Sequence, residues 1–204
     1  MEIRSENVTE DLILEAARKV FMKRGYFGAR MQEIADEAGI NKSLLHYYFR
    51  SKDKLFEKII ADAIYQLVDK LLALVERDIP FEEKIGLFVH EYMEQISKNP
   101  YLPGFLMHEL SFSPEKIPAL LSEKIHLIPA SFFRQIKNEM AKGNIIKTEP
   151  LQIFMNIFSL AVFPLVARPL IQFINKMPNE EYDRLLEERK HLVTRFILNG
   201  IKAK

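Results

Sequence analysis

The chain has 204 residues, of which 48% are hydrophobic and 28% are charged, and its formal net charge is +1. This length suffices for a small domain joined to a larger one with a sizeable core. The near-neutral charge argues against nucleic-acid binding through bulk charge alone. The absence of cysteine excludes disulfides and thiolate metal sites. Residues 1–9 are polar and lack the apolar core of a signal peptide, so we expect a cytoplasmic protein.

Apolar residues recur at steps of three and four through most of the chain, which predicts an all-α protein. The helices expected in the N-terminal third cover about 9–23, 31–37, 42–49 and a longer segment from 52 that ends before 80. Thr9, Asn41 and Ser51 are suitable N-caps for the first, third and fourth of these helices. Gly25 and Gly39 are expected to end the first and second helices.

The remaining chain predicts helices with several breaks. They are expected at about 81–98, 103–111, 114–142, 150–175 and 179–199. The third is expected to bend near Pro118 and Pro129, and the fourth at Pro164 or Pro169. The apolar stretch 151–174 approaches the length of a membrane span. Its prolines and Arg168 favour a helix buried between protein surfaces, so we expect no membrane.

Residues 31–49 have the form of a helix-turn-helix motif. Gly39 lies at the sharp turn, where the chain leaves the first helix through a left-handed conformation. Ile40 is expected to pack back into the core, and Asn41 opens the second helix. Three residues of that helix, Leu45, Tyr48 and Phe49, share one face, which is expected to point inwards.

The opposite face of this second helix is polar, aromatic and basic: Lys42, Ser43, His46, Tyr47 and Arg50. Such side chains reach base edges and phosphates in a major groove. Residues 39–54 hold four basic residues and one acidic residue, so positive charge is concentrated there. Ser51 and Lys52, at the start of the next helix, suit a phosphate. The alternative is a helical hairpin with a solvated basic face.

Three segments carry a resemblance to the TetR family of transcriptional regulators: ILEAARKVFMKRGY (13–26), EIADEAGINK (33–42) and LHYYFRSKDKL (45–55). The resemblance covers about residues 7–67. It implies a DNA-binding domain there, with the helix-turn-helix at about 30–49. It also implies that residues 68–204 form a larger ligand-binding and dimerisation domain.

The resemblance further implies a homodimer that binds double-stranded DNA and changes the separation of its recognition helices when a small molecule binds. The implied dimer interface consists of the helices at about 150–175 and 179–199. The apolar run 153–174 supports it, because this run is too hydrophobic to face water; ordinary core burial is the alternative. The positions implied to contact DNA are Met31, Asn41, Lys42, Ser43, His46, Tyr47, Tyr48 and Lys52.

This chain departs from the family pattern at three places. Arg30 and Met31 stand where Thr or Ser usually opens the second helix, so we expect Arg30 to supply the phosphate contact. His46 replaces a common Tyr. Leu44 replaces a small or polar residue, and we hypothesise that it packs on a thymine methyl group. The alternative is that Leu44 packs against the first helix.

The sequence contains no Gly-rich phosphate loop, no nucleophile elbow and no His/Cys cluster, so we expect neither an enzyme nor a cofactor. His90 and Glu94 lie one helical turn apart, with Glu91 adjacent. No third metal ligand is evident, so we expect no metal.

Aromatic residues in the middle of the chain suit a pocket for an apolar or amphipathic effector. The residues predicted to bind it are Phe88, Tyr92, Phe105, His108, Phe112, Phe133 and Phe158. The same residues suit a packed core. Two functions therefore stay open: a ligand-responsive repressor of an inverted-repeat operator, and a regulator controlled by a protein partner. A cavity of about 300 Å³ or more favours the first, and a filled core with an exposed apolar patch favours the second.

Overall fold

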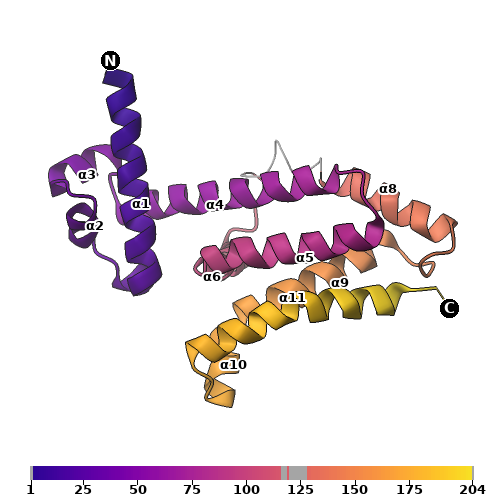
Figure 1. The fold of residues 1–204 in the computed structure, drawn as a ribbon. Coiled ribbons are helices and arrows are strands. Elements are labelled where there is room, and N and C mark those ends of the chain that lie inside the picture. The colour runs from indigo at the N-terminus through magenta and orange to yellow at the C-terminus, as the bar shows by residue number, and fades with distance from the viewer. Residues whose placement is uncertain (1, 116–118, 120–127, 204) are drawn as a thin grey trace. The chain divides into compact units, whose positions relative to one another are not determined.

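The computed structural model describes residues 2–115, 119 and 128–203 (Figure 1). These residues form helices, turns and loops, with no strand among them, so the predicted all-α class is confirmed. Tertiary contacts divide the chain into two units. Unit 1 comprises Met1–Tyr65 with Asn99–Leu102, and unit 2 comprises Gln66–Lys98 with Pro103–Lys204.

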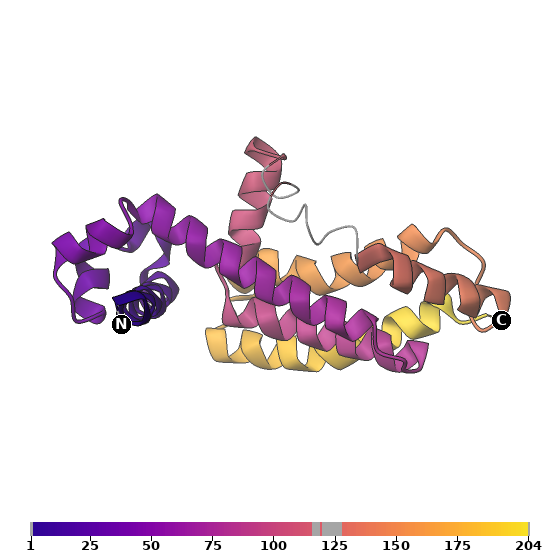
Figure 2. The same cartoon turned by 90° about the horizontal axis from the view of Figure 1, so that it is seen from above.

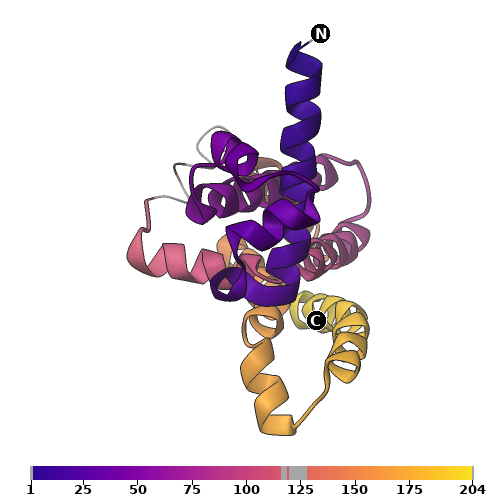
Figure 3. The same ribbon diagram turned by 90° about the vertical axis from the view of Figure 1, so that its left-hand side faces the viewer.

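Unit 1 contains α1 (Glu2–Gly28), α2 (Met31–Glu37), α3 (Lys42–Tyr48) and the first part of α4 (Lys52–Val75). The N-terminal turns of α1 extend beyond α2 and α3 (Figure 3). The core of the unit consists of side chains that are at most 1% exposed: Ile13, Ala17, Phe21, Ile34, Ala35, Leu45, Leu55 and Ile59. Each helix contributes to this core, which sets the orientation of α2 and α3 within the unit.

The first helix differs from the sequence prediction at both ends. It begins at Glu2 rather than after Thr9, so Thr9 is not its N-cap. No Gly or Pro interrupts the chain between Glu2 and Arg24, and an acidic first turn favours a helix N-terminus. Gly25 breaks the helix as expected, with φ 68° and ψ 173°, but a further helical turn follows it.

Unit 2 contains the end of α4, α5 (Phe81–Lys98), α6 (Leu102–Phe112), α8 (Ile128–Ala141), α9 (Pro150–Val166), α10 (Arg168–Asn175) and α11 (Asn179–Ile201). Helices α5, α9 and α11 lie side by side (Figures 1 and 2). The part of the predicted helix 114–142 that includes Pro118 lies outside the described residues. Pro129 starts α8 rather than bending it, because the first turn of a helix tolerates a residue without an N–H group.

The predicted kink in the helix 150–175 lies at Ala167, between the two candidate prolines, where α9 and α10 meet at 60°. Pro164 has no N–H group to donate to the carbonyl of Leu160. Arg189 of α11 donates to that carbonyl instead (3.1 Å), and the Tyr182 hydroxyl donates to the carbonyl of Pro164 (2.6 Å). Helix α11 therefore supplies the hydrogen bonds that the bend removes.

Within the described residues, no single helix has both the length and the hydropathy to cross a membrane, although the bent pair α9 and α10 passes that test when counted together.

Candidate nucleic-acid interface

The turn between α2 and α3 is closed by two backbone hydrogen bonds. The N–H group of Gly39 donates to the carbonyl of Asp36 (3.2 Å), and that of Ile40 donates to Ala35 (3.0 Å). Gly39 has φ 67°, the left-handed conformation that this type of helix end requires. The predicted role of Gly39 in ending α2 is confirmed.

The start of α3 is fixed by Asn41, as the sequence predicts. Asn41 is extended (φ −79°, ψ 156°), and its side-chain oxygen accepts a hydrogen bond from the N–H group of Leu44 (2.8 Å). One turn later Leu45 is fully buried and Phe49 is 8% exposed. The predicted inward face of α3 is therefore confirmed for these two residues, and Tyr48 is half-buried beside them.

Most of the residues predicted to contact DNA are exposed: Arg30, Asn41, Lys42, Ser43, His46 and Tyr47. The others are half-buried: Met31, Leu44, Tyr48 and Lys52. Tyr47 is 73% exposed, and its ring meets that of Tyr48 edge to face with centroids 5.4 Å apart. The exposed Tyr47 ring lies on the same helix as the exposed side chains of Lys42, Ser43 and His46. Together these groups can contact phosphates and base edges.

The imidazole ring of His46 contacts the backbone just after the end of α3. Its Nδ1 atom lies 3.3 Å from the carbonyl oxygen of Arg50, which can accept a hydrogen bond from a protonated Nδ1.

At the start of α4, Ser51 makes a contact that the sequence predicted, and Lys52 makes contacts that it did not. Ser51 caps the helix, because its Oγ accepts a hydrogen bond from the N–H group of Lys54 (3.2 Å). The ammonium group of Lys52, which was expected to meet a phosphate, donates to the carbonyls of Tyr26 (2.9 Å) and Ala29 (3.2 Å). Sequence reasoning missed these contacts because they join residues 23 to 26 positions apart.

Salt bridges also join α1 to its neighbours. Arg24 pairs with Glu33 of α2 at 3.1 Å, and Arg18 pairs with Asp62 of α4 at 3.5 Å. Because these pairs are partly exposed, each contributes little to stability. The apolar core, rather than charge, therefore holds α2 and α3 in place.

Comparison with known proteins identifies this arrangement. Residues 13–59 match the family of bacterial regulatory proteins called the tetR family. Residues 13–59 are a TetR-family segment. This match includes the whole helix-turn-helix, the end of α1 and the start of α4.

Two curated relatives and one solved structure extend the comparison. The "HTH-type transcriptional repressor NicS" of Pseudomonas putida is 38% identical over 122 residues, which cover 58% of this chain and 49% of that protein. The match thus spans about half the length of this relative. The "Probable HTH-type transcriptional regulator YttP" of Bacillus subtilis is 26% identical over 180 residues, or 85% of this chain and 86% of that protein. FadR of Bacillus subtilis, solved in complex with stearoyl-CoA, shares the fold with a TM-score of 0.60 at 16% identity, over 90% of this chain and 96% of that one. The relatives are transcriptional regulators rather than enzymes.

Beyond the TetR-family segment, the seven residues predicted to bind an effector differ widely in solvent exposure. Phe88 and Tyr92 are buried, and burial raises the pKa of the Tyr92 phenol. Phe105 and Phe133 are half-buried, whereas three of the seven are exposed: His108, Phe112 and Phe158. The His108 ring lies 4.9 Å from that of Phe112.

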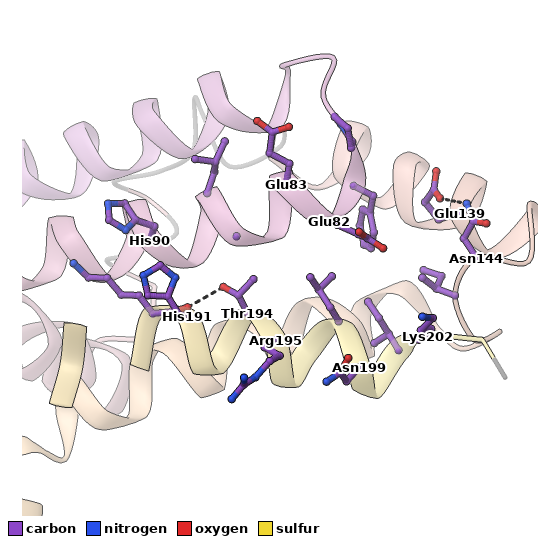
Figure 4. Close-up of a pocket in the computed structure, with 18 residues that line it drawn as sticks. Glu82, Glu83, His90, Glu139, Asn144, His191, Thr194, Arg195, Asn199 and Lys202 are labelled. Atoms are coloured by element: carbon purple, nitrogen blue, oxygen red, sulfur yellow. Dashed lines mark hydrogen bonds between the residues drawn. The ribbon is translucent and has the colours of Figure 1, made fainter. Parts of the chain in front are cut away.

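None of these seven residues lines a cavity of about 1090 Å³ that lies along α5 and α11 (Figure 4). Its apolar lining includes Phe81, Leu87, Ile145, Leu198 and Ile201. Its polar lining includes Glu82, Glu83, His90, His191, Thr194, Arg195, Asn199 and Lys202. Sequence reasoning missed this cavity because its lining resembles the solvent-facing sides of two amphipathic helices.

The carboxylate of Glu94, considered above as a metal ligand, is paired with two lysines. It accepts hydrogen bonds from Lys190 (2.9 Å) and Lys98 (3.2 Å), and the Lys190 bond in particular lowers its pKa. Over residues 2–115, 119 and 128–203, no three His, Cys, Asp or Glu side chains are grouped as a metal site requires.

Proposed function

We propose that this protein is a transcriptional repressor that binds an inverted-repeat operator as a homodimer and is released by a small molecule. The outward face of α3 carries the proposal. Leu45 is fully buried on one side of this helix, while Lys42, His46 and Tyr47 are exposed on the other. A rigid helix with exposed cationic, imidazole and aromatic groups suits insertion into a major groove.

The test measures binding to the DNA upstream of the protein's own gene and to random DNA of equal length. We expect the upstream DNA to bind at least about 1,000-fold more tightly than random DNA at physiological salt. The double variant Lys42→Ala/Tyr47→Ala is expected to bind both DNAs more weakly and, through the loss of Tyr47, to lose most of this preference. Lys70→Ala, at an exposed lysine of α4, is the matched control. Equal binding of both DNAs by the wild type would contradict the proposal.

The homodimer is supported by exposed apolar residues on the last three helices: Leu151, Met155, Phe158, Phe163, Leu170, Phe173, Ile174, Leu185, Leu192 and Phe196. On α11, Leu185, Leu192 and Phe196 are spaced to form one stripe. Exposed apolar side chains gathered on three consecutive helices favour a protein partner. We take that partner to be a second copy of the chain, whose recognition helix would enter the next major groove, about 34–36 Å away.

The effector is proposed to be an amphipathic small molecule. The cavity along α5 and α11 is lined in part by buried apolar side chains, which include Phe81, Ile145 and Ile201. Two further lining residues, Arg195 and Lys202, have no acidic partner among the described residues. Stearoyl-CoA, the ligand of FadR, likewise joins an apolar chain to anionic phosphates. It is therefore the first compound to test.

The effector test compares stearoyl-CoA with coenzyme A and stearate alone. We expect stearoyl-CoA to raise the melting temperature, since a ligand at 100 times its Kd stabilises by about 2.7 kcal/mol, and to release operator DNA. The double variant Arg195→Glu/Lys202→Glu is expected to lose this response. An unchanged response in that variant would place the site elsewhere. Release by a cell extract but by no acyl-CoA would favour the alternative of a protein partner.

A further inference from the structure

The connection between α1 and α2 leaves two backbone carbonyls without helical partners. The chain breaks at Gly25 and is extended at Arg30 (φ −120°, ψ 142°) before α2 begins. Over the described residues, no backbone N–H group donates to the carbonyl of Tyr26 or Ala29. Ala29 is 2% exposed, and a carbonyl in such a place needs a donor from within the protein.

Lys52 supplies that donor for both groups. Its ammonium nitrogen lies 2.9 Å from the carbonyl oxygen of Tyr26 and 3.2 Å from that of Ala29. The same nitrogen lies 4.5 Å from the centroid of the Tyr26 ring, within the range of a cation–π contact. An ammonium group has three protons and no acceptor. Two protons are therefore engaged by carbonyls, and the aromatic ring covers a further side of the charge.

Two other residues of α4 hold Tyr26 from the same helix. The Tyr26 hydroxyl donates a hydrogen bond to the carboxylate of Asp53. This bond raises the pKa of Tyr26 from the ordinary value of 10 to about 12, because the carboxylate favours the protonated phenol. One turn later, Phe56 packs with its ring centroid 4.7 Å from that of Tyr26. The first two turns of α4 thus contact Tyr26, near the end of α1, through three side chains.

We propose that Lys52 is a positioning residue, which holds the end of α1 and the start of α2 against α4 and so sets the pose of the helix-turn-helix. This inference rests on the proposed DNA-binding function, and it replaces the phosphate contact expected for Lys52 from the sequence. A phosphate at this ammonium has to compete with the two carbonyls and the aromatic ring that already surround it. Losing these bonds would leave the carbonyl of Ala29, a residue that is 2% exposed, without a donor, and an unsatisfied buried carbonyl is costly.

Lys54 and Lys42 provide matched comparisons within the same unit. Lys54 is exposed two residues along α4, where it pairs with Glu57 at 3.0 Å. Lys42 is exposed at the start of α3 and is the lysine proposed to contact DNA. Each can be replaced by methionine, which keeps the aliphatic stem and removes the charge.

The experiment measures operator and random-DNA affinities of Lys52→Met, Lys54→Met and Lys42→Met over a range of salt concentrations. For Lys52→Met we expect operator affinity to fall by about tenfold or more, the effect of one mismatched base pair, with random-DNA affinity nearly unchanged. The slope of log K against log salt stays at the wild-type value. For Lys42→Met we expect both affinities to fall and the slope to flatten by about 0.9 for each phosphate that the variant no longer neutralises.

Acylation of lysines in the wild-type protein gives a second measurement that does not depend on any variant folding. Using sulfo-NHS acetate and mass spectrometry, we expect Lys52 to react slowly with and without operator. Lys54 is expected to react fast in both states, and Lys42 to react fast in the free protein and slowly on DNA.

Three results would overturn the proposal. Lys52→Met could behave as Lys42→Met, with a flattened slope, which would make Lys52 a phosphate ligand. A folded Lys52→Met could bind operator as tightly as the wild type, which would leave Lys52 with a role in stability alone. Lys52 could be acylated as fast as Lys54 in the free protein, which would contradict the contacts themselves. If the wild type fails to prefer operator DNA, the DNA-binding proposal fails separately, and acylation of the free protein decides the Lys52 contacts.

Discussion

Leu44 is half-buried at the third position of α3, where Asn41 holds its N–H group. It is therefore unlike Leu45, which has no exposed surface, and unlike Ser43, which is exposed. An apolar side chain in this place can both cover the edge of the core and present a methyl group to DNA. The contact of Leu44 with thymine therefore stays a hypothesis that the partial exposure of this side chain allows.

We predict that Leu44→Ser relaxes the preference for thymine at one position in each half-site, by about 1 kcal/mol, since the thymine methyl is the apolar feature of the major groove. The melting temperature should change little, because the side chain is already partly solvated. Affinities for operators with each base at each position would measure this. A large fall in melting temperature with base preference intact would show that Leu44 serves the core.

A second residue-scale feature is the buried ammonium group of Lys190, which links α11 to α5. Its side chain is 3% exposed and lies 2.9 Å from Glu94 and 2.7 Å from Glu187. A buried charge that loses a partner is costly. We therefore predict that Glu94→Gln lowers the melting temperature at neutral pH.

The effect of Glu94→Gln should depend on pH in a defined direction. The hydrogen bond from Lys190 holds the pKa of Glu94 below its ordinary value of 4.5. A carboxylate with a lowered folded-state pKa stabilises the fold fully above pH 4.5, and this contribution is lost as the pH falls through the lowered pKa. Melting temperatures of the wild type and Glu94→Gln should thus converge in acid. A difference that grew on acidification would contradict the assignment, and Glu91→Gln serves as a control without this bond.

At the scale of the elements, two glycines differ in whether their backbone conformation requires glycine. Gly25 breaks α1 with φ 68° and ψ 173°, a conformation almost restricted to glycine. Gly104 lies within α6, and a Cβ atom added to it meets nothing within 4 Å.

We predict that Gly25→Ala destabilises the protein by about 1–3 kcal/mol, although no atom lies within 4 Å of the added methyl group. Gly104→Ala should be neutral or stabilising by about 0.5 kcal/mol, because alanine favours the helix. Urea unfolding measures both. Similar stabilities for the two variants would mean that the break at Gly25 is not required.

At the scale of the whole molecule, we propose that the exposed apolar surface of the last three helices forms the interface between two copies of the chain. Phe196 of α11 is 69% exposed within this surface, and Phe112 of α6 is 77% exposed outside it. We predict that Phe196→Glu yields a monomer at micromolar concentration and weakens operator binding, since each half-site is then bound without the other. Phe112→Glu is the matched control and should stay dimeric. Analytical ultracentrifugation distinguishes these outcomes, and a monomeric wild type with tight operator binding would contradict the dimer.

The amino-acid sequence by itself determined the features that depend on neighbours within a few residues. The predicted bounds of α2 and α5 match Met31–Glu37 and Phe81–Lys98. The caps at Asn41 and Ser51 and the left-handed Gly39 were also predicted. Each follows from hydrogen bonds or steric limits that span three to five positions of the chain, so a single sequence contains the necessary information. The TetR-family resemblance rests on the same local segments.

The tertiary structure alone decided which distant residues meet. The pattern of α4 marks Lys52 as a cation near DNA, yet its partners are the carbonyls of Tyr26 in α1 and Ala29 just after it. The aromatic residues expected to form a pocket are divided between core and surface, while a cavity lies along α5 and α11. The bend after Pro164 depends on donors from α11. Such contacts depend on how helices pack, and packing is set by the shapes of many side chains together rather than by any short segment.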